Sequence, residues 1–354
     1  MYRLKIVNGR IFDGERFNEG GLYIEDGRIA EIGELSGRKA DYTFDAAGDI
    51  VSAGLVDMHV HFEGISTDIY GISADAACLP DGVTAAAECG AEKGNKAFSD
   101  AMKVKNVIFA ITDIRKDKAV LTRTKKVLSA YRDKAVGVKV YYDTGGWDIR
   151  SIDPLQEIVD FAKEKGLKTC VHSTHTPVPM VKIVETLSPG DILTHIYHGY
   201  EHPVDEDDFA AFRLAKEKGV ILDAGHAGEV HTNFALFRKA VERGFLPDTI
   251  STDITCLSAY LRGGYYGLPM AMSFYRTLGV PEEMIWKAVT VTPGEVLHQK
   301  DWGQLYAGGP ADIAVLHRGK RPYALTDAAG NTLKDSFSYF CRLTVMNGQV
   351  LFKR

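Results

Sequence analysis

Apolar runs of strand length recur along the chain and alternate with segments that have the period of a helix. Three of the helical segments are Pro154–Lys165, Asp205–Lys218 and Asn233–Arg243. This alternation is typical of a parallel sheet covered by helices, and eight apolar runs predict a closed (β/α)8 barrel of the TIM type. An open doubly wound sheet is the alternative, although no Gly-x-Gly-x-x-Gly follows an early strand. The runs are Gly54–Phe62, Gly82–Glu88, Asn106–Thr112, Val136–Tyr142, Leu167–Ser173, Asp191–Tyr197, Gly219–Gly225 and Asp248–Asp253.

The two ends of the chain have a different pattern, in which short β-prone runs are separated by turn dipeptides. Neither end is long enough to bury a core of its own. We therefore expect one small β-sandwich domain built from residues 1–50 and 308–354, beside a barrel of residues 51–307. The dipeptides, which are typical of hairpins, are Asn8-Gly9, Asp13-Gly14, Asp26-Gly27 and Asn347-Gly348.

Composition and charge indicate which kinds of partner and which cellular location to expect. The chain has 354 residues, of which 45% are hydrophobic and 25% charged, with a net charge of −5. No block of Lys and Arg stands out, so we expect neither a nucleic acid nor a membrane as partner. The five cysteines lack any Cys-x-x-Cys and indicate reduced thiols, and the chain starts directly in strand-like sequence, so a cytoplasmic location is expected. A small-molecule substrate is the expected partner, and a homo-oligomer stays open.

Residue types that can bind metal ions stand at the ends of the predicted strands, and in such a barrel the strand ends form the catalytic face. His59 and His61 end the first strand and point to the same side, so they could hold one ion. An isolated His-x-His is as often accidental, but further candidate ligands follow. Imidazole and carboxylate groups suit divalent zinc. The others lie on later predicted strands, namely Lys139, His172, His195 and Asp253.

Lys139 fits such a site only if it loses its charge, because a buried ammonium beside a cation is repelled and desolvated. A carboxylated Lys139 would be an anion able to bridge two metal ions. The alternative is a buried lysine paired with an acid such as Asp143. In the bridged arrangement one ion would be held by His59, His61 and Asp253, and the other by His172 and His195.

These motifs together resemble the amidohydrolase superfamily of metal-dependent hydrolases over nearly the whole chain. The resemblance rests on Asn8-Gly9-Arg10-Ile11, Asp57-Met58-His59-Val60-His61, the later ligand strands and Gly309-Pro310-Ala311-Asp312-Ile313-Ala314. It implies metal ligation by His59, His61, carboxylated Lys139, His172, His195 and Asp253, with Asp253 also moving the proton. Stretches 191–195, 223–228 and 247–253 are most similar to the dihydroorotase-like or deacetylase-like branch. Dihydroorotases carry an arginine where this chain has Glu63.

The hypothesis that follows is a hydrolase in which two zinc ions share a hydroxide that attacks the carbonyl of an amide or acyl ester. The amide would be of the N-acyl (deacetylase) type or cyclic, and Asp253 would transfer the proton to the leaving group. Loops after the strands would contact the substrate, and the candidate residues are Glu63, Tyr142, His198, His226 and Arg262.

Three other functions compete with this one. A deaminase acting on a purine-like amidine usually needs one metal and no lysine bridge, so Lys139 argues against it. A non-catalytic oligomeric scaffold would have lost its ligands, whereas all six positions are filled here. A lactonase or phosphotriesterase-type esterase would use the same hydroxide on another electrophile.

Overall fold

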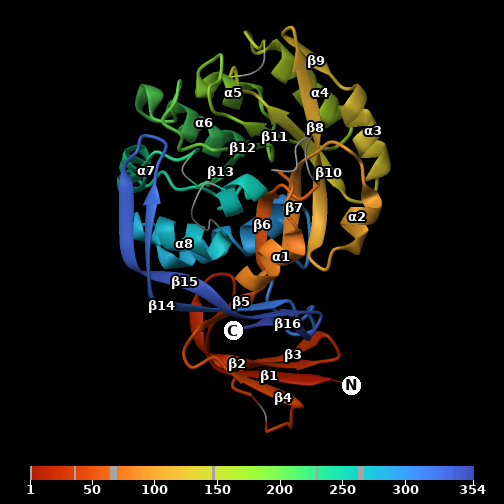
Figure 1. The fold of residues 1–354 in the computed structure, drawn as a ribbon, viewed down its shortest axis with the longest axis vertical. Coiled ribbons are helices and arrows are strands. Elements are labelled where there is room, and N and C mark those ends of the chain that lie inside the picture. The colour runs from red at the N-terminus through yellow and green to blue at the C-terminus, as the bar shows by residue number, and fades with distance from the viewer. Residues whose placement is uncertain (1, 36, 64–69, 146–147, 229, 262–266) are drawn as a thin grey trace.

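The computed structural model describes residues 2–35, 37–63, 70–145, 148–228, 230–261 and 267–354. Figure 1 shows a barrel of strands surrounded by helices, with the strands from both ends of the chain gathered on one side of it. Arg262, one of the predicted substrate contacts, lies outside the described residues. No described helix is long and apolar enough to cross a membrane.

Parallel strands form the wall of the barrel in the order β6, β7, β8, β10, β11, β12 and β13. Their interior is apolar below the strand ends, where Met58, Phe109 and Ile192 pack in one buried cluster. The short strand β9 (Lys118–Val120) extends β8 as a hairpin. The bounds are β6 Leu55–Val60, β7 Val83–Ala91, β8 Lys105–Arg115, β10 Ala135–Tyr141, β11 Lys168–His172, β12 Ile192–Thr194 and β13 Ile221–Asp223.

The eighth predicted run closes the barrel without forming a regular strand. Isolated parallel bridges join Thr249 to Asp223 on one side and Ile254 to Val60 on the other. Backbone hydrogen bonds accompany them, including Asp253 N to His59 O at 2.8 Å. Asp253 has a φ of +52°, which breaks the extended conformation between the two bridges. The predicted barrel is confirmed, and the segment that closes it is irregular.

Helices cover the outside of the barrel (Figure 1). Asn233 caps α7 by accepting a hydrogen bond from Leu236 N at 3.0 Å. The predicted helix Asp205–Lys218 is interrupted at Phe209, where φ is +63°, and only its second part is α-helical. The bounds are α1 Ala74–Cys78, α2 Lys96–Ala101, α3 Thr122–Ala130, α4 Asp153–Glu164, α5 Met180–Thr186, α6 Ala210–Lys218, α7 Phe234–Glu242, α8 Leu268–Thr277, α9 Glu282–Ala288 and α10 Val291–Val296.

The strands of both chain ends form one sheet, called here the terminal sheet, in the order β16, β15, β14, β5, β1, β2 and β3, with β4 beside β1. β5 joins the two halves, because it pairs with β1 and with β14. The bounds are β1 Arg3–Phe12, β2 Phe17–Glu25, β3 Arg28–Gly33, β4 Tyr42–Asp45, β5 Ile50–Ala53, β14 Ile313–Thr326, β15 Thr332–Met346 and β16 Gln349–Lys353.

One predicted hairpin turn is wrong. Asn8-Gly9 lies within β1, where the register against β2 shifts between Ile6 and Gly9. Asn8 has a φ of +56°, so the dipeptide forms a bulge in a continuing strand. The dipeptides Asp13-Gly14 and Asp26-Gly27 do separate β1 from β2 and β2 from β3.

A partly buried ionic cluster connects the terminal sheet to the barrel. Glu282 of α9 lies 3.0 Å from Nη1 of Arg10 in β1 and 2.9 Å from Nη1 of Arg276 in α8. It also accepts a hydrogen bond from the hydroxyl of Tyr339 in β15. The long β14–β15 hairpin reaches along the barrel to α8, as Figure 1 shows, and Tyr339 N donates to Ser273 Oγ of α8 at 2.8 Å.

Candidate metal centre

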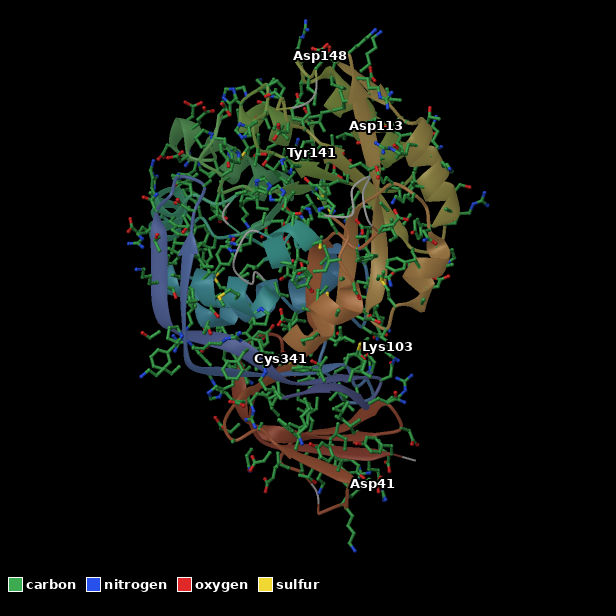
Figure 2. The ribbon with its side chains drawn as sticks, in the orientation of Figure 1. Asp41, Lys103, Asp113, Tyr141, Asp148 and Cys341 are labelled. Atoms are coloured by element: carbon green, nitrogen blue, oxygen red, sulfur yellow. The ribbon has the colours of Figure 1, made fainter. Side chains whose placement is uncertain are left out.

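The carboxyl ends of the barrel strands surround a cavity of about 750 Å³. Figure 2 shows two of its lining residues, Tyr141 and Asp113, in the half of the molecule away from Asp41. Five of the six side chains that the sequence predicts as metal ligands line this cavity. The sixth, His195, is buried with its ring beside those of His172 and His231. The candidate ligands divide into two groups.

The first group consists of His59, His61 and Asp253, whose candidate ligand atoms all lie within 4.8 Å of one another. Asp253 Oδ1 is 2.9 Å from His61 Nε2 and 3.2 Å from His59 Nε2. His59 lies in β6, His61 directly follows the last residue of that strand, and both imidazoles line the cavity. The backbone bond from Asp253 N to His59 O holds the carboxylate beside them.

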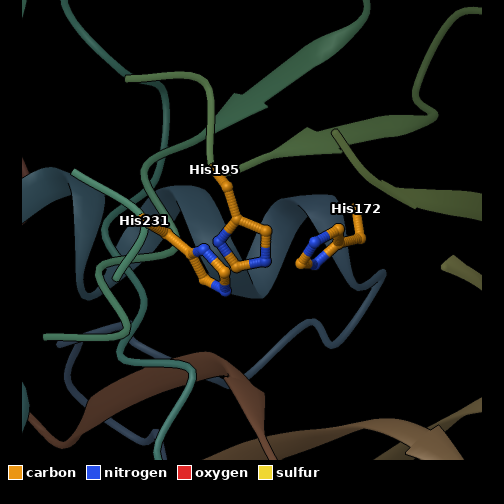
Figure 3. Close-up of side chains that lie close together, drawn as sticks. All are labelled: His172, His195 and His231. Carbon is orange, nitrogen blue, oxygen red and sulfur yellow. The ribbon is translucent and has the colours of Figure 1, made fainter. Parts of the chain in front are cut away.

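The second group consists of His172, His195 and His231, again within 4.8 Å of one another (Figure 3). His172 is the last residue of β11, and His195 directly follows Thr194, the last residue of β12. His231 comes from the segment between β13 and α7, and sequence reasoning did not select it as a ligand. Its ring centroid is 4.3 Å from that of His195, and its Nε2 is 3.7 Å from Asp253 Oδ2. Asp253 therefore lies next to both groups.

Lys139 belongs to the same site. Its Nζ lies 3.0 Å from His59 Nε2, and its side chain is buried above Cys170, with Nζ and Sγ 3.8 Å apart. The alternative pairing with Asp143 does not occur, because Asp143 Oδ2 accepts a hydrogen bond from Thr174 and lies 3.5 Å from His172 Nε2. Among the described carboxylates, none forms an ion pair with Lys139.

The hydrogen bonds of His195 leave one of its ring nitrogens available to a metal ion. Its Nδ1 lies 2.7 Å from the carbonyl oxygen of Gly225, which can only accept, so Nδ1 carries the proton. Its Nε2 therefore has a lone pair, and this buried atom has no hydrogen-bond partner among the described residues. A buried acceptor of this kind is normally satisfied, and metal-bound histidines commonly donate their other nitrogen to a carbonyl in this way. The donor set thus fits divalent metal ions.

Burial keeps most of these imidazoles neutral, which is the form that binds metal. It lowers the pKa of His59 to about 4, with help from the charge of Lys139, and the pKa of His172 to about 3. Burial also disfavours protonated His61, but Asp253 and Glu88 outweigh it and raise its pKa to about 9.

Asp253 is the anionic member of the site. Burial opposes its charge, yet the neighbouring histidines, His59 first, hold the pKa of its carboxyl well below the usual value. Asp253 and His195 both have left-handed backbone, with φ of +52° and +64°. Such conformations cost about 1–3 kcal/mol each and cluster at functional sites.

Four of the predicted substrate contacts are not among the described residues that line the cavity. Glu63 accepts hydrogen bonds from the backbone of the segment after β7 and from Tyr131, so it organises that loop. Tyr142 points to Ser151 O. His198 accepts from Tyr200 N, and His226 packs against Phe274. The described lining includes Tyr70, Tyr141, His175 and Tyr200 instead.

Comparison with known proteins gives a consistent picture. The model of the amidohydrolase family matches residues 50–350. The chain is 28% identical over 377 residues to a deacetylase of Enterococcus faecalis, covering 99% of both proteins. Among solved structures, a dihydroorotase aligns with a TM-score of 0.86 at 23% identity, covering 100% of this chain and 98% of the other. An adenine deaminase aligns with a TM-score of 0.84 at 24% identity, covering 100% of both.

Proposed function

The chain belongs to the amidohydrolase family, and from that premise we propose that it is a metal-dependent deacetylase-type enzyme that hydrolyses an amide bond of a small molecule. The scissile bond would be an N-acyl amide or a cyclic amide, with an acyl ester as the other electrophile that the same chemistry accepts. The observation that carries the proposal is the position of Asp253, which adjoins two groups of metal-binding side chains in one cavity.

The two groups define where the ions would bind. His59, His61 and Asp253 would hold one, and His172 and His195 the other, with His231 as an additional candidate ligand. We propose zinc for both. Divalent ions there would supply Lewis acidity towards the carbonyl and would lower the pKa of water to near neutrality. Lys139, carboxylated on Nζ, would supply an anion next to His59 Nε2.

Asp253 would act as the general base and then as the acid. Its low pKa keeps it ionised at neutral pH, so it can accept the proton of the attacking water. The left-handed backbone at Asp253 directs the carboxylate towards both groups, and the bond from its N–H to His59 O fixes the main chain. From this position it would deliver the proton to the leaving nitrogen.

The substrate would occupy the part of the cavity lined by Tyr70, Tyr141 and Tyr200. Arg123 also lines it, but two carboxylates already bind this guanidinium, Glu92 on one side and Asp113 on the other. In this part of the cavity, the substrate would therefore contact the aromatic rings and hydroxyl groups of the tyrosines, and the charge of Arg123 is already balanced by its two carboxylates.

A hydrolysis screen tests the proposal. The metal-free protein and protein reconstituted with zinc in bicarbonate buffer would be assayed on N-acetyl amines and amino acids, cyclic amides, acyl esters and adenine. We expect zinc-dependent cleavage of at least one amide class. Release of ammonia from adenine with no amide cleavage would favour a deaminase, and a protein that binds no divalent metal would overturn the proposal.

We also propose a cytoplasmic location. All five cysteines are free, and the buried pair Cys89 and Cys170 has Sγ atoms 3.6 Å apart without a disulfide. Free thiols persist in a reducing compartment. Detection of the protein in a periplasmic or extracellular fraction would contradict this location.

A further inference from the structure

We propose that Thr194 and Thr174 are positioning residues, each of which fixes the tautomer of one histidine, His59 and His172 respectively, through a histidine–threonine–aspartate chain of hydrogen bonds. The two chains serve different groups of the metal centre. The link to metal binding rests on the proposed function, but the tautomers themselves can be measured without metal.

The first chain runs from β6 to β12 and β13. His59 Nδ1 lies 3.3 Å from Thr194 Oγ1, and Thr194 Oγ1 lies 2.7 Å from Asp223 Oδ2. Asp223 is buried and accepts two further hydroxyl hydrogen bonds, from Thr249 at 2.8 Å and Ser251 at 2.7 Å. Three hydroxyl groups therefore surround this carboxylate.

The direction of the hydrogen bonds follows from the groups present. An ionised carboxylate only accepts, so the hydroxyl hydrogen of Thr194 points to Asp223. Oγ1 then has only acceptor capacity for His59, and Nδ1 must carry the proton. This leaves the lone pair of His59 on Nε2, the atom 3.0 Å from Lys139 Nζ and 3.2 Å from Asp253 Oδ1.

The second chain has the same order in a different part of the barrel. Thr174 donates to Asp143 Oδ2 at 2.8 Å, while Thr174 Oγ1 forms a hydrogen bond with His172 Nε2. Asp143 is held by the backbone N–H of Gly145 at 2.6 Å. The same reasoning places the proton of His172 on Nε2 and its lone pair on Nδ1. The two histidines thus use opposite ring nitrogens.

Each chain also limits ring rotation, because a ring flip would bring a carbon to the hydroxyl oxygen. Groups that orient a ligand from behind typically change metal affinity 10- to 100-fold when they are removed. Threonine suits this role since its single hydroxyl accepts from the ring and donates to the carboxylate at the same time.

The tautomers can be read directly. Long-range 15N–1H NMR spectra of the metal-free protein distinguish protonated Nδ1 from protonated Nε2. We expect His59 in the Nδ1–H form and His172 in the Nε2–H form. In Thr194→Val, His59 should become a tautomeric mixture while His172 is unchanged, and in Thr174→Val the reverse should hold. Thr194→Ser and Thr174→Ser keep the hydroxyl and should restore the native pattern.

Metal affinity provides the second measurement. Competition with a chelator should show that each valine variant binds zinc 10- to 100-fold more weakly at one of two sites, whereas the serine variants stay within about 3-fold of the native protein. Thr249→Val is the matched control, because it removes a hydroxyl from Asp223 but leaves the bond between Thr194 and His59. Thermal unfolding of the metal-free variants separates lost stability from lost orientation.

The outcomes separate this inference from the proposed function. Native tautomers that are unchanged in both valine variants would overturn the inference, whatever the enzyme hydrolyses. Zinc affinity that falls as far in Thr249→Val as in Thr194→Val would also overturn it, since the effect would then be structural. A native protein with the expected tautomers but without zinc binding would refute the proposed function and leave the two hydrogen-bond chains intact.

Discussion

Lys139 Nζ and His59 Nε2 lie 3.0 Å apart in a buried site. Burial disfavours the ammonium form of Lys139, but electrostatic interactions with the sulfur atoms of Cys170 and Cys89 and with the carboxylate of Asp253 outweigh this and raise its pKa. A metal ion on His59 would meet that positive charge directly. A charged Lys139 would therefore oppose metal binding, and carboxylation of Nζ would remove this repulsion.

We accordingly predict a carbamate on Lys139 in the metal-loaded protein. Reconstitution with zinc in 13C-labelled bicarbonate should give a carbamate carbon signal that is absent from Lys139→Met, and zinc binding to that variant should fall well below the native level. Lys168→Met is the control, since Lys168 is half-buried on β11 and its Nζ contacts Gly190 O outside the cavity. Full zinc binding without a carbamate signal would contradict the prediction.

We predict that Asp253→Asn lowers kcat by about 10²- to 10⁴-fold, the usual contribution of a general acid–base group. The amide cannot accept the proton of water, while its size preserves the packing around His59 and His61. Steady-state kinetics on whichever amide the screen identifies would measure the loss. Asp248→Asn changes an acid of the same segment that binds Lys216 and should leave kcat near the native value. Native turnover in Asp253→Asn would remove Asp253 from this role.

Gly225→Ala should disrupt the second group of ligands. Gly225 has a φ of +53°, and an added Cβ would lie 2.2 Å from Thr194 Oγ1 and 2.4 Å from His195 Nδ1. We expect loss of zinc from this group together with a lower melting temperature. Gly244→Ala is the control, because it has a φ of +75° with open space around it and should cost only the backbone strain, about 1–2 kcal/mol. Equal effects of the two substitutions would show that the contacts at Gly225 are unimportant.

Glu282→Gln should make the protein less stable at neutral pH. Burial opposes the charge of Glu282, but the hydrogen bonds from Tyr339 and Arg10 and the charge of Arg276 outweigh it and lower its pKa. A carboxyl whose folded-state pKa is lowered stabilises the fold above its unfolded-state pKa, about 4.3, and this contribution is lost as pH falls through the folded value.

The free energy of unfolding should therefore differ between native protein and Glu282→Gln by about 1–3 kcal/mol at pH 7, and the difference should shrink below about pH 4. Urea titrations at several pH values would measure it. Glu283→Gln, at the exposed neighbouring position, should have little effect at any pH. A difference that grows as the pH falls would have the wrong sign.

Most of the metal centre could be predicted because strand geometry positions it. Alternation within a strand and the common direction of parallel strands place His59, His172 and Asp253 at the same edge of the barrel. The structure does bring the six predicted side chains together, although their role as ligands stays a prediction.

The parts that sequence reasoning missed depend on contacts between distant segments. His231 lies in an irregular segment between β13 and α7, and the position of such a segment depends on the elements packed around it. The residues next to His231 in the sequence do not form a recognisable metal-binding motif. Glu63 comes three residues after the end of β6, yet its carboxylate accepts hydrogen bonds from the backbone after β7. Asn8-Gly9 forms a bulge because β2 continues to pair with β1 on both sides of it. The turn propensity of a dipeptide does not show whether a neighbouring strand continues past it.

The junction at β5 has a consequence for synthesis on the ribosome. Ala53 of β5 pairs with Ile313 of β14, so about 260 further residues must be translated before that edge of β5 is covered, roughly 10 to 50 s at 5–20 residues per second. During this interval the nascent chain carries an unpaired strand edge, which is a site for association with other chains. Slow translation or scarce chaperones should therefore reduce the yield of folded protein more than the stability of the finished molecule would suggest.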